Sequence, residues 1–441
     1  MTRNTFSPVV ALCLAALTLE GYDLLMYGTV VPSLLAYEPW DLDPATVGVL
    51  GSVVGVGMLV GALAAGSIAD RWGRRRALIA AVALFSAAMG CCAIAPSPEM
   101  FGAARFVVGV GAGVLMPTAA SMLIEFSRLD TRARTVALGF VGTSVGGIAA
   151  GILSLWLVPA FGFRAMFAAG MIPALLILPM MIGYLPESPA FLNSRGRTDA
   201  AQRISARYGL EDTVEVSGVE PTSTDRGIGA LFTATRARVT LSFWVMTMLC
   251  LLVLFGVATW LPAVMRSAGY PLGAALSFLL VLNVGGAVGA LGGAYLADRF
   301  GIKPVTTLGF LCAAVSLALI ATTPPIGIVY VLVLIAGMGT TGTQILLNTF
   351  VGGYYPVSCR TTGLGVALAV GRLGAIVGPT YGGLFVAAGA GTSTQLLAFA
   401  LPAVIGAGVT VLIPAGRKLR SGRASTSEGL LHVPETKCLH S

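Results

Sequence analysis

Long apolar stretches separated by short polar segments dominate the pattern of this 441-residue chain. Twelve of these stretches are long enough to cross the hydrocarbon core of a bilayer, which takes roughly 20 residues in a helix. We therefore predict an all-α membrane protein with twelve transmembrane helices. The expected spans lie near residues 8–36, 46–69, 77–96, 100–126, 134–160, 165–185, 239–265, 273–297, 304–323, 326–350, 361–387 and 392–415.

One long polar segment interrupts this pattern near the middle of the chain. It predicts four parts: an N-terminal six-helix bundle (1–185), a cytoplasmic linker (186–238), a C-terminal six-helix bundle (239–416) and a cytoplasmic tail (417–441). We expect a short helix around Asp199–Tyr208 in the linker.

A short polar loop occurs twice, first as Asp70-Arg71-Trp72-Gly73 and again 228 positions later as Asp298-Arg299-Phe300-Gly301. Each copy lies between two long apolar stretches, so the chain looks like two copies of one membrane-embedded unit. Internal duplication of this kind is typical of secondary transporters, which bind their substrate between the repeated halves.

Composition and charge agree with a membrane protein. Apolar residues make up 56% of the chain, the mean hydropathy is +0.88 and only 10% of the residues are charged, against about a quarter in soluble domains. The net charge of +8 does not indicate a nucleic-acid partner, because its distribution follows the expected topology. All Lys and Arg residues except Arg105, Arg164, Arg266 and Arg372 fall in segments assigned to one side, which the positive-inside rule makes cytoplasmic. We therefore expect an inner-membrane protein with both termini in the cytoplasm.

Residues that would indicate a metal, a cofactor or a nucleotide are not placed to form a site. The seven cysteines show no metal-ligand spacing, and both histidines, His432 and His440, lie in the polar tail. The linker contains no nucleotide motif. We expect no metal, cofactor, nucleotide or enzymatic activity, and we expect the partners to be the lipid bilayer, protons and a small-molecule substrate.

Four motifs, in the expected order and loops, resemble those of the major facilitator superfamily. They are the loop Gly66–Arg75, its weaker copy Asp298–Lys303, the fourth-span motif Arg105–Gly113 and the segment Pro186–Pro189. The resemblance covers about residues 8–415 and implies two six-helix bundles that expose a central site to each side of the membrane in turn.

In that superfamily, charges at the inner loops pair across helix ends and close the cytoplasmic gate. Carried over to this chain, the resemblance implies that role for Asp70, Arg71, Glu125, Arg132, Asp298, Arg299 and Arg360. The alternative, that loop charges only set the topology, fits Arg74, Arg76 and Arg128 better.

Few charges lie well inside the predicted spans, and two of them are neighbours on one helix. Glu20 and Asp23 are three positions apart and share one face of the first helix, about 4.5 Å apart along its axis. Two carboxylates in a poorly hydrated site suit reversible protonation near neutral pH. Arg105 in the fourth span is within reach of Asp23, so we predict a proton-coupling group of Asp23, Glu20 and Arg105; the alternative is a purely structural ion pair.

Arg372 lies near the middle of the eleventh span, and no acid of the C-terminal bundle is expected at its depth. A guanidinium without a fixed counter-charge favours an anion, and a substrate carboxylate matches its paired donors. The alternative is an Arg that extends toward the interface or bonds to backbone carbonyls.

Two further segments resemble one branch of the superfamily, the aromatic acid:proton symporters. Glu20-Gly21-Tyr22-Asp23 is similar to their Asp-Gly-x-Asp motif in helix one, with Glu20 in place of the commoner Asp, and Ala258–Pro262 is similar to their helix seven. The resemblance implies import of benzoate or a hydroxybenzoate together with protons.

An aromatic acid needs a flat apolar slot with a few polar contacts. We expect Tyr22 and Trp260 to contact the ring, and Gln344 and Asn348, four positions apart on one helix face, to donate or accept hydrogen bonds. Two other functions remain open: an exporter that exchanges a drug or metabolite for protons, and a membrane sensor that transports nothing.

Overall fold

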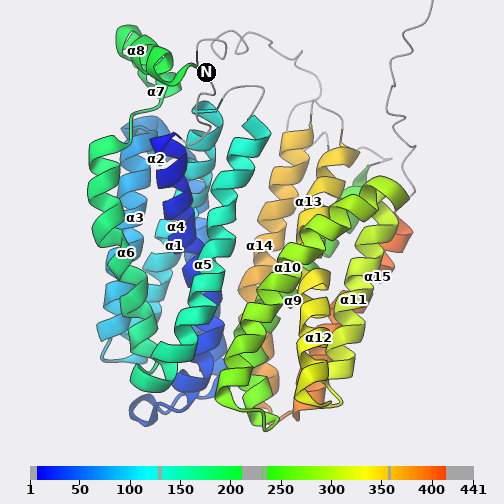
Figure 1. Cartoon of the computed structure of the whole chain (residues 1–441). Coiled ribbons are helices and arrows are strands. Elements are labelled where there is room, and N and C mark those ends of the chain that lie inside the picture. Colours follow the sequence, from blue (N-terminus) through cyan, green and yellow to red (C-terminus); the bar gives the residue numbers. More distant parts are fainter. Residues whose placement is uncertain (1–6, 128–131, 211–230, 232–235, 356–358, 414–441) are drawn as a thin grey trace, which may run out of the picture.

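The computed structural model describes residues 7–127, 132–210, 231, 236–355 and 359–413. Within these ranges the regular secondary structure is entirely helical (Figure 1). The α-helices are α1 (Pro8–Leu35), α2 (Pro44–Trp72), α3 (Arg74–Ile94), α4 (Pro98–Glu125), α5 (Arg132–Phe161), α6 (Phe163–Tyr184), α7 (Pro189–Ser194), α8 (Thr198–Tyr208), α9 (Ala237–Ser267), α10 (Leu272–Phe300), α11 (Ile302–Ile320), α12 (Ile326–Gly337), α13 (Thr343–Tyr354), α14 (Arg360–Ala387) and α15 (Thr392–Leu412). A short 3-10 helix, η1 (Glu38–Trp40), and a π-helical turn, η4 (Met338–Gly342), complete them.

Twelve helical spans in the described residues are long and apolar enough to cross a membrane, with α12, η4 and α13 forming one of them, Ile326–Tyr354. Each matches one predicted span, with ends that differ by a few residues, so the predicted all-α fold is confirmed. The linker contains α8 where a helix was expected and, in addition, the six-residue α7.

Side-chain caps explain where several spans begin. Ser7, Asp43 and Ser97 each accept a backbone N–H bond at the start of α1, α2 and α4, and each is followed by a proline in the first turn. Hydrogen bonds from the Thr46 side chain and backbone hold the pKa of Asp43 below its usual range.

The two copies of the repeated loop have the same backbone conformation. Gly73 ends α2 with a φ of 93° and Gly301 ends α10 with a φ of 95°, in the left-handed region that favours glycine. The sequence repeat is therefore also a repeat of local structure.

Figure 1 shows the spans as two groups, a first bundle of α1–α6 and a second bundle of α9–α15, with α7 and α8 at one end of the first bundle. The bundles contact each other mainly through α1 with α9, α2 with α14 and α5 with α10. We call these contacts the bundle seam.

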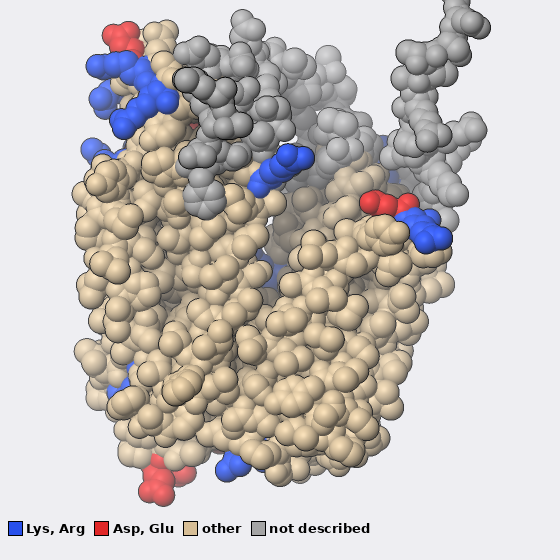
Figure 2. Space-filling model, in the orientation of Figure 1, with Lys and Arg blue, Asp and Glu red and all other residues tan. Residues whose placement is uncertain are grey.

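The bundle seam lies toward the end of the molecule opposite α8. One of its polar contacts joins Ser52 Oγ and Thr380 Oγ1 at 2.7 Å. Ser52 is 20 positions from Trp72, where α2 reaches the α7–α8 end. The backbones approach so closely at Gly28 that a Cβ there would lie 1.9 Å from the carbonyl oxygen of Ala258. In Figure 2 a crevice between the two halves widens toward the α8 end.

The face of the molecule in Figure 2 carries a broad, largely uncharged band, with most of its charged side chains gathered at the two ends. Large apolar side chains are exposed within this band, among them Leu63 (77%), Trp156 (75%) and Leu291 (78%). A continuous apolar surface of this size is not typical of soluble proteins, so the band is the part that lipid covers.

Candidate functional site

A buried ion pair joins α1 to α4. Arg105 Nη1 donates to Asp23 Oδ1 at 2.5 Å, and only 2% of each side chain is exposed. The Tyr27 and Phe167 rings lie 4.7 and 5.7 Å from the guanidinium carbon and add cation–π attraction. The contact predicted between Asp23 and Arg105 is therefore present, whereas its role in proton coupling stays a prediction.

Glu20 lies one turn from Asp23, toward the α8 end of α1. Its side chain is completely buried, and neither carboxylate oxygen has a hydrogen-bond partner in the described part of the chain. Its electrostatic partners are Arg372 and Asp23. Burying a carboxylate without hydrogen bonds lowers the stability of the fold, so stability does not explain the presence of Glu20.

Arg372 extends from α14 of the second bundle into the first bundle. Its Nη1 donates to the Met58 carbonyl oxygen at 3.4 Å, and its Nη2 lies 3.9 Å from the Met116 sulfur. Within the described residues these contacts engage two of its five N–H donors, which leaves donors for an anion. The contact with the Met58 carbonyl oxygen fits the alternative given above, in which Arg372 bonds to backbone carbonyls.

The sequence prediction for Arg372 considered only acids of the second bundle, and it missed Glu20 as a neighbour. The two side chains interact electrostatically across the interface between the bundles. A sequence does not show which helix faces of two bundles meet, so no pattern in the chain pointed to this pair.

The two aromatic residues chosen for ring contact are both packed inside helix interfaces. The Tyr22 hydroxyl donates to the Met166 carbonyl oxygen of α6 at 2.8 Å, and the Trp260 indole N–H donates to the Pro379 carbonyl oxygen of α14 at 2.7 Å. Both are at least 94% buried. Contact of either ring with a substrate stays a prediction.

Gln344 and Asn348 do share one face of α13, since Gln344 Nε2 donates to Asn348 Oδ1 at 2.9 Å. Gln344 Oε1 is buried without a hydrogen-bond partner among the described residues. The pair follows directly after the π-helical turn η4, a feature that is frequent at functional sites.

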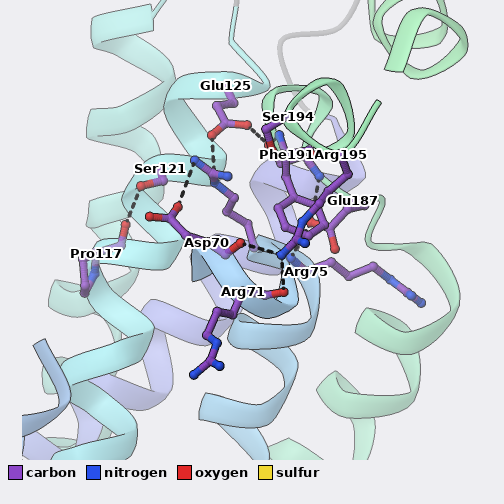
Figure 3. Close-up of polar contacts among 12 residues, drawn as sticks. Asp70, Arg71, Arg75, Pro117, Ser121, Glu125, Glu187, Phe191, Ser194 and Arg195 are labelled. Carbon is purple, nitrogen blue, oxygen red and sulfur yellow. Dashed lines mark hydrogen bonds and ion pairs between the residues drawn. The ribbon is translucent and has the colours of Figure 1, made fainter. Parts of the chain in front are cut away.

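A polar cluster at the α8 end of the first bundle contains three of the predicted gate residues, Asp70, Arg71 and Glu125 (Figure 3). Arg74 lies between Asp70 of α2 and Glu125 of α4, with N–O distances of 4.0 and 3.3 Å. Our interpretation of Arg74 as a purely topological charge was therefore wrong. It failed because the end of α4 is distant in sequence from the loop that α4 contacts.

The start of the linker completes this cluster. Glu187 accepts a hydrogen bond from the Arg75 backbone N–H at 3.0 Å, and Ser188 Oγ donates to Glu125. Arg195 donates to the carbonyl oxygens of Asp70 and Arg71 at 3.2 and 2.9 Å, and Figure 3 shows it beside them. The motif Pro186–Pro189 was the signal for these contacts, but the sequence did not show what they touch.

Of the other predicted gate residues, those whose side chains the structure describes form no ion pair between the bundles in this conformation. Asp298 and Arg299 are exposed at the end of α10, and Arg132 is half-buried at the start of α5. The Arg360 side chain and all of Arg128 lie outside the described residues. Among the residues that are described, the ion pairs at the α8 end all lie within the first bundle.

Two bundles of apolar helices, with a buried charge cluster where they meet, define a multi-pass membrane protein built as a transporter. The chain matches the Major Facilitator Superfamily over residues 13–379 and belongs to that superfamily. It is therefore a transporter and not an enzyme.

Two relatives place the chain near the aromatic acid transporters. The benzoate transport protein of Acinetobacter baylyi is 33% identical, over 93% of this chain and 90% of its own length. The gentisate transporter of Corynebacterium glutamicum is 36% identical, over 88% and 83%. The crystal structure of a D-xylose–proton symporter is similar in fold, with a TM-score of 0.71 and 18% identity over 91% of this chain and 96% of that one.

Proposed function

We propose that this protein is a proton-coupled symporter that imports a small aromatic carboxylate, such as benzoate or a hydroxybenzoate. The observation that carries the proposal is the position of Arg372, a cation of the second bundle that extends into the first and interacts electrostatically with a buried carboxylate. The two relatives are named as transporters of benzoate and of gentisate, and both of these compounds are aromatic carboxylates. An anion of this kind matches the free donors of Arg372.

In this proposal Arg372 binds the substrate carboxylate, and Asp23 accepts a proton and releases Arg105. Tyr22, Trp260, Gln344 and Asn348 contact the ring or its substituents once the helices rearrange. The α8 end, both termini and the linker are cytoplasmic, in the inner membrane. The bundles, residues 1–185 and 239–416, move as two bodies, and the conformation described above is the one closed to the outside.

The proposal is tested by uptake into proteoliposomes that contain the purified protein, with an acidic exterior and labelled benzoate or gentisate. We expect accumulation above the equilibrium concentration, abolished by a protonophore. Movement of the acid against the proton flux would favour the exporter instead. Binding without any flux would favour a sensor.

A further inference from the structure

Glu20 and Arg372 belong to different bundles but lie at the same depth. Helices α1 and α14 are both 28 residues long, and both start at the α8 end (Figure 1). Glu20 is the twelfth residue after Pro8, and Arg372 is the twelfth after Arg360. At a rise of about 1.5 Å per residue, each lies roughly 18 Å from the start of its helix. The two charges therefore lie at the same depth, near the middle of their helices, and they interact electrostatically without a direct hydrogen bond among the described residues.

Each carboxylate of α1 has its own cation. Asp23 is bonded to Arg105, so that pair is neutral by itself. Glu20 has no hydrogen bond among the described residues, and Arg372 is the cation that interacts with it. The four side chains together carry no net charge when both acids are ionised. A substrate carboxylate at Arg372 would therefore leave one uncompensated negative charge in a poorly hydrated site, which is costly.

Among the described residues, the groups near Glu20 offer no other cation to balance that charge. Arg105 of α4 contacts Asp23, and the hydroxyls of Tyr22 and Tyr27 donate to backbone carbonyls. The remaining charged residues of the helices that pack against α1 lie in first or last turns: Asp70 and Arg71 of α2, Glu99 and Glu125 of α4, Arg132 and Arg134 of α5, Arg164 of α6, Arg238 and Arg266 of α9, and Asp298 and Arg299 of α10.

We propose that Glu20 and the substrate carboxylate compete for Arg372, so that each bound acid brings one proton to Glu20. Protonation of Glu20 restores neutrality and frees the guanidinium for the substrate. When the substrate leaves, Glu20 loses its proton and Arg372 regains its fixed partner. The inference rests on the proposed function and adds to it a proton count and the residue that sets it.

The test measures binding and proton uptake together, with purified full-length protein in weakly buffered detergent solution and benzoate or gentisate as probes. In the wild type we expect at least one proton taken up per bound acid, and an affinity that falls about tenfold per pH unit where Glu20 is ionised. Glu20→Gln should take up one proton fewer and lose that part of the pH dependence. Its affinity should therefore fall less steeply with rising pH than that of the wild type.

Three comparisons make the result specific to Glu20. Asp23→Asn, the matched neutralisation one turn away, should keep the proton linked to Glu20. Benzamide, which has the ring but no charge, should bind without taking up that proton. Arg372→Gln removes the cation that Glu20 and the substrate share. This variant should bind the acids more weakly, and that binding should no longer be linked to a proton on Glu20. It therefore tests the competition even if Glu20→Gln does not fold.

Wild-type proton uptake and pH dependence in Glu20→Gln would overturn the competition, as would an undiminished, wild-type proton uptake in Arg372→Gln. Either result would leave the proposed function standing, because the acids still bind. Failure of both acids to bind the wild type at any pH would overturn the proposed function and the competition with it.

Discussion

At the residue scale, the Asp23–Arg105 pair is stable away from water only while both side chains are charged. Asn at position 23 is nearly isosteric but cannot exchange a proton. We expect Asp23→Asn to lower gradient-driven accumulation of benzoate well below the wild-type level, because the proton on Glu20 would be the one left to drive it. Exchange of external labelled benzoate for internal unlabelled benzoate should continue, since exchange does not require release of the proton. Both rates are measured in the same proteoliposomes.

Asp23→Glu is the control for this prediction, because it keeps a carboxyl group one methylene further from α1. It should retain part of the accumulation that Asp23→Asn loses. Accumulation by Asp23→Asn at the wild-type level would show that the proton is carried elsewhere.

The site could be predicted from sequence where it depends on one helix or on depth alone. The spacing of Glu20 and Asp23 puts them on one face, and counting residues from the span ends puts Arg105 within reach. The proximity of Glu20 and Arg372 could not be predicted, since it depends on how helices of different bundles are rotated toward each other. The packing of Trp260 against α14 was missed because it depends on how two helices of the same bundle are rotated toward each other.

At the element scale, α7 depends on one side chain for its first turn. Ser188 Oγ accepts the Phe191 backbone N–H at 3.1 Å and donates to Glu125, so it caps α7 and ties it to α4. We expect Ser188→Ala to cost about 1 kcal/mol of stability, the usual effect of losing an N-cap. The melting temperature should fall and transport should slow, while the affinity for benzoate stays unchanged.

Ser194→Ala provides a matched control at the other end of α7. The Ser194 hydroxyl bonds only to the Phe191 carbonyl oxygen in the described structure and is exposed. Its removal should change neither the melting temperature nor transport. Equal losses of melting temperature and transport in the two variants would contradict a specific role for the contact between Ser188 and Glu125.

The sequence predicted long elements well and short ones poorly. Spans are defined by length and hydropathy, and capped starts such as Ser7-Pro8 and Ser97-Pro98 are visible in the chain. The six-residue α7 is too short to show an apolar period. The π-helical turn η4 has the same apolar and small residues as the α-helix around it, so nothing in the pattern distinguishes it.

At the scale of the whole molecule, the sequence does not determine which conformation is observed, because every conformation of such a transporter uses the same helices. The described structure is closed at the bundle seam, while Asp70 (74% side-chain exposure) and Asp298 form no bond to the other bundle. Their predicted gate role therefore belongs to the opposite conformation.

We expect Asp70→Asn and Asp298→Asn to slow turnover severalfold with little change in benzoate affinity, as measured by initial uptake rate and equilibrium binding. Weaker binding at unchanged turnover would contradict a gate role.

The bundle seam offers a direct test of alternation. Ser52 Oγ and Thr380 Oγ1 are 2.7 Å apart, close enough that cysteines at both positions can form a disulfide after small adjustments. In a background without the native cysteines, oxidation of Ser52→Cys/Thr380→Cys should stop benzoate uptake, and a reductant should restore it. Each single variant under the same oxidation should keep its uptake, which controls for damage by the oxidant.

The cross-link also measures how the two ends of the molecule are coupled. If the seam and the gate close in turn, weakening the gate shifts the population toward the conformation with a closed seam. Asp70→Asn added to the cysteine pair should therefore increase the rate of cross-linking, although Asp70 lies at the far end of α2 from Ser52. Undiminished uptake by fully cross-linked protein would show that the seam does not open during transport. An unchanged cross-linking rate in Asp70→Asn would show that the two ends move independently.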